Sequence, residues 1–292
     1  MKKALVFGGF GFLGYYLTKA LLKRQYEVTV ADIIEDNELE EEVNYMYCDI
    51  SEETQVAKVF DSNTFNVVYN LAGFANLDVA IKFPIKTMNL NVMGNMYILK
   101  QCVEKKVEKF VYASSAYAMS NKGSFYGISK LASEKIIEEY HKKHNLTFII
   151  LRYGSVYSEK PYDNNYIYNL VKRAVKENRI DHYGDGKEIR EYIHAADAAK
   201  LSVDVIESNV FSNLHVILTG TERMQRFELF QMINEILSGQ VSVNCEDSGY
   251  QNHYKFTPYS FEPSVSRKLT ANPHIDMGQG LLECIREVHR HE

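Results

Sequence analysis

Tryptophan is absent from the 292-residue sequence, and proline and cysteine are scarce, with five and four residues. The four cysteines, Cys48, Cys102, Cys245 and Cys284, form no C-x-x-C pair and have no histidines beside them at zinc-ligand spacing. We therefore expect reduced thiols in a cytoplasmic protein, and no metal site. No apolar run approaches the roughly 18 residues that a membrane-spanning helix needs, so no membrane segment is expected.

Basic residues are not in excess either, because the formal net charge is −5 and the isoelectric point is about 6.0. Without a basic stripe, nucleic-acid binding is not expected as the main role. The remaining composition, 46% hydrophobic and 24% charged residues, is typical of a globular protein with a sizeable core. The length suits one large domain or two closely associated ones.

The chain opens MKKALVFGGFGFLGYYL, with the basic start and apolar centre of a secretory signal peptide. A signal peptide also needs a cleavage site of small residues after that centre. Residues 18–24 instead read TKALLKR, which continues an amphipathic helix. The stretch is therefore interpreted as a buried strand that leads into a glycine turn and a helix.

Short β-rich segments alternate with helical patterns in the first half of the chain. We expect strands at residues 4–7, 27–31, 45–48, 67–71, 109–113 and 147–151, and helices at 12–24, 88–105 and 126–144. The second half is less regular, with helices expected at residues 167–178, 195–208, 226–237 and 280–289. The alternation predicts right-handed βαβ units, and hence an α/β fold with a Rossmann-type, doubly wound parallel sheet.

Gly8, Gly11 and Gly14 follow the first expected strand and open a helix. In dinucleotide-binding loops such glycines allow a tight turn, the approach of a pyrophosphate and the packing of helix on strand. A merely tightly packed loop would give the same triplet. Asp32 favours the dinucleotide, because a carboxylate at the end of the second strand can accept hydrogen bonds from an adenosine ribose. Residues 33–36 contain no Arg or Lys to balance a 2′-phosphate, so NAD is favoured over NADP.

Tyr126 and Lys130 are four residues apart near the start of a long expected helix, so they share one face, with Ser124 as the candidate N-cap. An ammonium beside a phenol favours the phenolate and lowers its pKa from the usual value of about 10, which makes Tyr126 a candidate base. Ser114 and Ser115 end the fifth strand, at the edge where parallel sheets bind ligands. A surface Tyr–Lys pair and an ordinary strand-ending turn are the alternatives.

With these features in this order, the chain resembles the extended short-chain dehydrogenase/reductase family, and within it the NAD-dependent epimerase/dehydratase branch that acts on nucleotide sugars. The resemblance covers nearly the whole chain. The motifs that carry it are GGFGFLG at 8–14, CDI at 48–50, NLAG at 70–73, NVMG at 91–94, ASSA at 113–116, YGISK at 126–130, LRYGSVY at 151–157 and GDGKEIREYIHAAD at 184–197. It implies an NAD-binding domain over residues 1–157 and a smaller, mixed α/β, mainly substrate-binding region over residues 158–292, some segments of which return to the first domain.

The resemblance also implies roles for the matching residues. Ser115, rather than Ser114, would hydrogen-bond the reacting oxygen, Tyr126 would be the base, and Lys130 would hold the nicotinamide ribose. The residues that it assigns to the cofactor are Gly8, Gly11, Phe12, Leu13, Gly14, Asp32, Asp49, Ile50, Leu71, Ala72, Gly73, Tyr126, Lys130 and Tyr153.

For the substrate, the resemblance implies contacts from Ser115, Ser155 and Arg190. The guanidinium of Arg190 would clamp the diphosphate, although a surface ion pair with Glu188 or Glu191 is the alternative. Helices 88–105 and 126–144 resemble those that form a dimer interface in this family, so a homodimer is expected, unless they only cover the sheet.

The two residues that follow Ser115 argue against one of the reactions of this branch, dehydration. Dehydratases of this branch have an Asp–Glu pair there, because eliminating water needs a further acid and base, whereas this chain has Ala116 and Tyr117. We therefore expect an epimerase that oxidises and re-reduces C4 of a nucleotide sugar with retained NAD. The alternatives are an NAD(P)H-dependent reductase of a 4-keto nucleotide sugar and, in another class, a non-catalytic dinucleotide-binding scaffold or sensor.

Three departures from the family pattern point to an atypical sugar or nucleotide. Residues 118–120 read AMS instead of VYG, and Ser155 replaces an asparagine. A second C-terminal arginine has no clear counterpart, and Lys255 or His253 is the candidate substitute.

Overall fold

The computed structural model describes residues 1–35, 39, 41–61, 63–120, 122–221 and 223–246. Several expectations concern residues outside these ranges: the thiol of Cys284, the helix at 280–289, the candidate cations Lys255 and His253, and residues 247–292 of the expected substrate-binding region.

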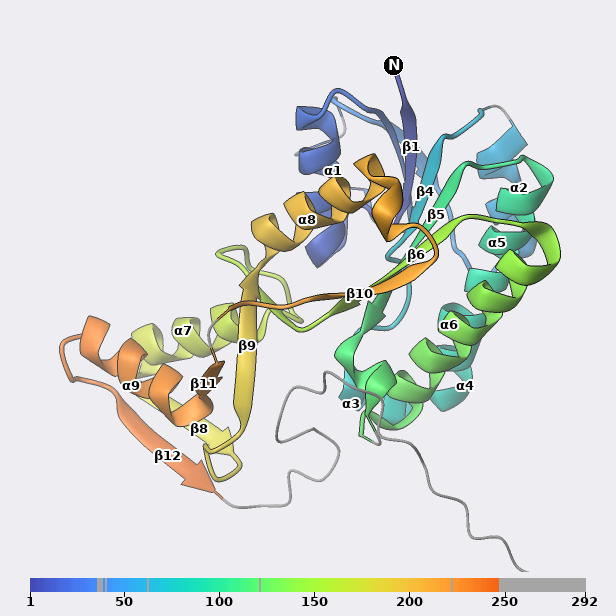
Figure 1. Ribbon diagram of the computed structural model, residues 1–292. Helices are drawn as coiled ribbons and strands as arrows, with labels where there is room; N and C mark the ends of the chain where they lie inside the picture. The colour runs from blue at the N-terminus through green and yellow to red at the C-terminus, as the bar shows by residue number, and fades with distance from the viewer. Residues whose placement is uncertain (36–38, 40, 62, 121, 222, 247–292) are drawn as a thin grey trace, which may run out of the picture. The chain divides into compact units, whose positions relative to one another are not determined.

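Six strands from the first 153 residues and one later strand form a seven-stranded sheet (Figure 1). Its strands, in spatial order, are β10 (Leu214–Leu218), β6 (Phe148–Tyr153), β5 (Lys109–Ser115), β4 (Val67–Asn70), β1 (Lys3–Phe7), β2 (Glu27–Asp32) and β3 (Asn44–Tyr47). All neighbouring pairs are parallel. The chain order reverses at β1, which lies between β4 and β2, and sheets of this kind bind ligands at the carboxyl ends of the strands beside such a switch. The predicted doubly wound fold is therefore confirmed, whereas β10 was not predicted.

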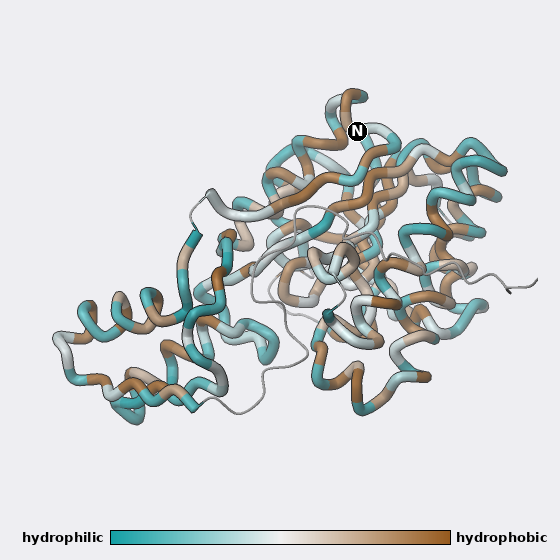
Figure 2. The backbone as a smooth tube through the Cα atoms, turned by 60° about the horizontal axis from the view of Figure 1, so that its bottom comes forward, coloured by the Kyte–Doolittle hydropathy of each residue, from teal (hydrophilic) through white to brown (hydrophobic). Residues whose placement is uncertain are grey.

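Helices cover both faces of this sheet (Figure 1). α1 (Phe12–Lys23) and α8 (Ala195–Glu207) lie on one face, and α2 (Glu53–Asp61), α5 (Asn95–Glu104) and α6 (Ser124–His144) lie on the other. In β1, Ala4 and Val6 belong to the apolar cluster under the first pair, and Leu5 and Phe7 belong to the cluster under the other three. Because both faces of the sheet are covered, its inner strands are made mainly of apolar residues. Figure 2 shows these segments in the brown of hydrophobic residues.

The helical segment expected at residues 88–105 begins earlier and is not uniform. After α3 (Leu77–Lys82), α4 (Pro84–Met88) begins with a proline in the first turn, where a missing N–H breaks no helical hydrogen bond. A π-helical turn, Asn89–Gly94, then leads into α5. α2, at residues 53–61, was not predicted from the sequence, although its apolar face packs on the sheet.

The second half contributes a smaller set of elements with an apolar core of their own. These elements are β7 (Ser155–Tyr157), α7 (Tyr166–Glu177), β8 (Arg179–Tyr183), β9 (Ile189–His194), β11 (Arg223–Gln225), α9 (Arg226–Ile236) and β12 (Ser242–Glu246). β9 pairs with β7 and β11, and β8 pairs with β12. The core side chains come mainly from α7 and α9. Since α8 and β10 pack with the large sheet, the proposed domain boundary at residue 157 stays a prediction.

Candidate active site

The three glycines of the first loop have different structural roles. Gly8 has φ +76°, and a Cβ on it would lie 2.7 Å from the backbone nitrogen of Ala72, so only glycine fits this turn. A Cβ on Gly14 would lie 1.9 Å from the carbonyl oxygen of Gly8, so α1 packs directly against the turn. Gly11 is the N-cap of α1 with φ −70°, and the nearest atom to its Cβ would be 3.4 Å away. Gly11 therefore leaves open space over the helix N-terminus.

Asp32 ends β2 beside this loop and is almost completely buried. Its carboxylate accepts hydrogen bonds from the backbone N–H groups of Phe10 (3.0 Å), Ile33 (2.8 Å) and Ile34 (3.2 Å). Burial raises the pKa of Asp32, and these three hydrogen bonds oppose the rise. The carboxylate is thus fixed in place at the edge of a cavity.

That cavity has a volume of about 760 Å³ and lies at the carboxyl ends of β1, β2 and β4. Of the residues expected to bind the cofactor, its walls contain Gly8, Gly11, Asp32, Asp49, Ile50, Leu71, Ala72 and Gly73. Sequence reasoning missed several other wall residues: Ile33, Ile34, Phe74, Lys82, Phe83, Pro84, Ile85 and Lys86. No motif marks these residues, because they come from loops and from the α3–α4 segment, which only the fold brings to this edge.

A second cavity, of about 300 Å³, shares Gly8, Gly11, Leu71 and Gly73 with the first. The second cavity is also lined by further residues that were expected to bind cofactor or substrate: Phe12, Leu13, Gly14, Ser115, Tyr126, Lys130 and Tyr153. The glycine loop therefore lines both cavities, with Asp32 on one side and the Ser–Tyr–Lys set on the other. The lining of the second cavity also includes Gly154 and Val156, which belong to the LRYGSVY motif but were given no role, and Asn164, which no motif marks.

Lys130 is buried on α6 and points toward the expected base. Its Nζ lies 5.9 Å from the ring centre of Tyr126 and 4.8 Å from that of Tyr112, and it donates a hydrogen bond to the carbonyl oxygen of Ala113 at 2.8 Å. Burial lowers the pKa of Lys130 to about 8, while the charge of Glu134 acts in the opposite direction.

The hydroxyl groups of the two serines at the end of β5 have different partners. Ser114 donates to the carboxylate of Glu134 at 2.5 Å, while Ser115 accepts from the backbone N–H of Tyr117 at 3.2 Å. The Ser114 hydroxyl is thus committed to a buried acid. One local prediction was wrong: the N-cap of α6 is Gly123, with φ +96°, and Ser124 is the first residue of the helix.

Neither Ser155 nor Arg190 is among the residues that line these two cavities. Arg190, on β9, is only 2% exposed, so it does not lie on the surface as the alternative required. His182, Glu188 and Arg226 are buried as well, and Nε2 of His182 lies 3.2 Å from the carboxylate of Glu188. Burial and the charges of both arginines lower the pKa of His182, while Glu188 acts in the opposite direction. Arg226 stacks on the ring of Tyr166 at 4.0 Å and was not singled out from the sequence.

The described part of the chain contains neither a metal-binding cluster nor a membrane-spanning helix. No group of three or more His, Cys, Asp or Glu side chains there is arranged to hold a metal ion. Nor does that part contain a helix with both the length and the apolar character of a membrane crossing.

Comparison with known proteins gives a consistent result. A sequence model described as "NAD dependent epimerase/dehydratase family" matches residues 4–217, which confirms the resemblance and NAD as the cofactor of the family. A UDP-glucose 4-epimerase of Neisseria meningitidis serogroup C is 26% identical over 267 residues, which cover 76% of this chain and 78% of that protein.

Solved structures agree on the fold. The UDP-glucose 4-epimerase of Thermotoga maritima, determined with UDP-glucose, has a TM-score of 0.80 at 21% identity and covers 90% of this chain and 94% of its own. The UDP-glucuronic acid 4-epimerase of Bacillus cereus, in complex with UDP-glucuronic acid and NAD, has a TM-score of 0.79 at 23% identity and covers 90% and 95%.

Proposed function

Because this chain belongs to the NAD dependent epimerase/dehydratase family, we propose that it is an NAD-dependent nucleotide-sugar epimerase acting at C4 of an NDP-hexose. The observation that carries the proposal is that Ser115, Tyr126 and Lys130 line one cavity together with the glycine loop. An enzyme that moves a hydride needs its proton-transfer groups beside the dinucleotide, and this arrangement provides that.

The first cavity fits NAD. Gly11 leaves room for a pyrophosphate over the N-terminus of α1, where free N–H groups and the helix dipole attract negative charge. The fixed carboxylate of Asp32 would accept hydrogen bonds from the adenosine ribose, and Asp49 and Ile50, which line the same cavity, would flank the adenine. NAD held there would supply the redox chemistry of the cycle, as the acceptor of the C4 hydride and its donor to the other face of the sugar.

The residues of the second cavity handle the proton. Tyr126, as the phenolate, accepts the proton of the C4 hydroxyl while the hydride leaves, and gives it back in the return step, so protons balance over the cycle. Ser115 donates a hydrogen bond to the C4 oxygen as that oxygen becomes a ketone. Lys130 favours the phenolate by its charge and hydrogen-bonds the nicotinamide ribose.

Arg190 would clamp the diphosphate of the substrate, and Ser155 would contact the substrate. Both roles remain proposals, since neither side chain lines the two cavities. Arg226 is the candidate second arginine because, like Arg190, it is buried and its charge lowers the pKa of His182. A cytoplasmic homodimer through α5 and α6 is proposed as well, and size-exclusion chromatography with light scattering tests the dimer. Exposed Met93, in the π-helical turn that precedes α5, and exposed Ile128, in α6, fit such an interface.

The function is tested by denaturing the purified protein and measuring released NAD, followed by a screen of UDP-, GDP-, CDP- and dTDP-sugars with NMR of the products. An epimerase releases about one NAD per chain and interconverts a sugar pair without added cofactor. A reductase consumes added NAD(P)H, and a scaffold gives no product. The Tyr126→Phe variant is expected to keep its NAD and lose roughly 10²–10⁴ in kcat. Full activity in that variant would refute the proposed base.

A further inference from the structure

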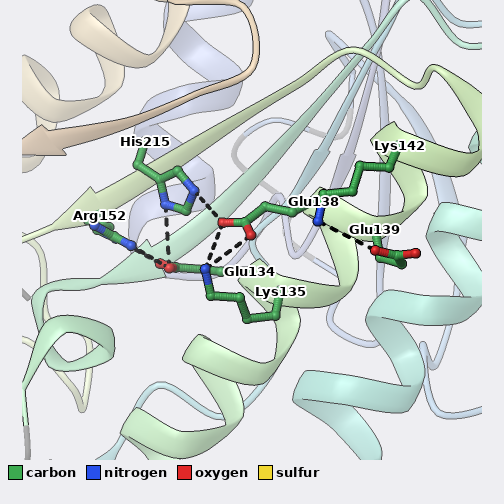
Figure 3. Close-up of polar contacts among 7 residues, drawn as sticks. All are labelled: Glu134, Lys135, Glu138, Glu139, Lys142, Arg152 and His215. Carbon is green, nitrogen blue, oxygen red and sulfur yellow. Dashed lines mark hydrogen bonds and ion pairs between the residues drawn. The ribbon is translucent and has the colours of Figure 1, made fainter. Parts of the chain in front are cut away.

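A buried carboxylate lies directly behind the proposed catalytic residues. Glu134 is fully buried on α6, four residues after Lys130, which itself is four residues after Tyr126, so the three share one helix face. Figure 3 shows Glu134 between Arg152 and His215. Arg152, on β6, donates Nε at 2.9 Å and Nη2 at 2.6 Å to the two carboxylate oxygens, and His215, on β10, approaches with Nδ1 at 3.4 Å.

We propose that Glu134 is a positioning residue of the active site, which fixes α6 against β5 and supplies the negative charge that Lys130 faces. The proposal rests on the proposed function, because Lys130 and Tyr126 have their roles only there. Nothing in the mechanism above requires a buried acid at this position, so the residue needs an explanation of its own.

The positioning part of the proposal follows from two adjacent contacts. Lys130 binds the carbonyl oxygen of Ala113 at 2.8 Å, and one helical turn later Glu134 accepts the hydroxyl of Ser114 at 2.5 Å. The next residue of β5 is Ser115. Two consecutive turns of α6 are therefore tied to two consecutive residues of β5, immediately before the serine that shares a cavity with Tyr126.

The electrostatic part follows from the burial of all the groups involved. Burial would raise the pKa of Glu134, but hydrogen bonds from Arg152, His215 and Ser114 bring it down to about 2, so the carboxylate is charged at any physiological pH. Lys130 is desolvated, and its pKa falls to about 8 even with Glu134 present. Without that negative charge the ammonium would lose its proton at a lower pH.

Other charged or titratable groups surround the pair. Among the described residues they are Tyr112 on β5, Tyr126 and Glu138 on α6, Arg152 on β6 and His215 on β10. Glu138 provides a matched control: it lies one turn beyond Glu134 on the same helix and binds His215 at 2.9 Å and Lys135 at 3.0 Å (Figure 3). Glu138 therefore shares His215 with Glu134 but is farther along the helix from Lys130.

The test measures NAD affinity by calorimetry from pH 6 to pH 9.5 on protein from which retained NAD has been removed, and it requires no sugar substrate. In the wild type, NAD affinity should fall as Lys130 loses its proton near pH 8. Glu134→Gln should move the midpoint of this fall down by about one pH unit, because the nearby charge is lost. Arg152→Gln should move it up, because the carboxylate of Glu134, which still accepts from Ser114, stays ionised near pH 8 and its charge is no longer neutralised. Glu138→Gln should leave the midpoint within about 0.3 units.

Each outcome has a definite meaning. An unchanged midpoint in Glu134→Gln, or an equal shift in Glu138→Gln, overturns the proposal. If Glu134→Gln does not fold, Arg152→Gln decides alone, and a midpoint that does not rise overturns it. Failure of the proposed function is distinguishable, because the midpoints would then move as expected while no sugar nucleotide is epimerised.

Discussion

A pair of glycine-to-alanine substitutions separates the fold of the dinucleotide loop from its binding surface. Gly11 and Gly14 both border the turn after β1, but the structure predicts a loss of stability for Gly14→Ala and a loss of NAD affinity for Gly11→Ala. In Gly14→Ala the new methyl group would lie 1.9 Å from the carbonyl oxygen of Gly8 and 2.8 Å from the Cα of Gly9. In Gly11→Ala it would meet the same oxygen at 3.4 Å, an ordinary contact, and would otherwise project into open space.

The magnitudes follow from these distances. The methyl group of Gly14→Ala overlaps backbone, so helix and turn must separate by about 1 Å or more to reach normal contact distances. Overpacking of this kind costs roughly 1–3 kcal/mol or more, against which alanine gains about 1 kcal/mol of helix propensity. In Gly11→Ala, the smaller entropy of the unfolded chain stabilises by about 0.4–1 kcal/mol, and the poorer N-cap costs a similar amount. Its unfolding free energy should therefore change by less than about 1 kcal/mol.

The assay is urea unfolding together with NAD calorimetry on both variants. Gly14→Ala should unfold at clearly lower urea. Gly11→Ala should unfold at the wild-type urea concentration but bind NAD at least about tenfold more weakly, because its methyl group occupies the place of the pyrophosphate. Wild-type NAD affinity in Gly11→Ala would show that the pyrophosphate lies elsewhere. Wild-type stability in Gly14→Ala would refute the packing argument.

Two further predictions concern charges at the site. Asp32→Ala should weaken NAD binding by about 10- to 100-fold and reduce the preference for NAD over NADP. The reason is that the variant lacks the carboxylate that accepts from the ribose and repels a 2′-phosphate. Calorimetry with both cofactors checks this, and an unchanged preference contradicts it. Lys130 has a folded-state pKa of about 8, below the value of about 10.4 in an unfolded chain, so its charge lowers stability below pH 8 and this cost disappears as the pH rises toward 10.4. Urea unfolding at pH 7 and pH 10 should therefore show a relative gain of roughly 2 kcal/mol in the wild type over Lys130→Met, and parallel curves for the two proteins would contradict this assignment.

Most of the large sheet was predictable because its strands are buried on both faces. Residues 67–71 were predicted as a covered strand from their continuous apolar character, and β4 occupies Val67–Asn70. The glycine turn and the position of Asp32 at the end of a strand were also predictable, because both depend on a few neighbouring residues. Local signals also misled: Ser124 is a good N-cap residue, but Gly123 has that position, since a Cβ there would lie 2.7 Å from the ring of Tyr117.

Sequence periodicity by itself thus determined the alternating elements, the glycine turn and the spacing of Tyr126 and Lys130, because each depends on residues within one or two turns of the chain. Only the tertiary structure decided what surrounds them. Glu134 reads as one more acidic residue in SEKIIEEYHKKH, and it becomes a buried anion because β6 and β10 bring Arg152 and His215 against it. Pairings across 18 and 81 residues are set by strand order in the sheet, which no local pattern encodes.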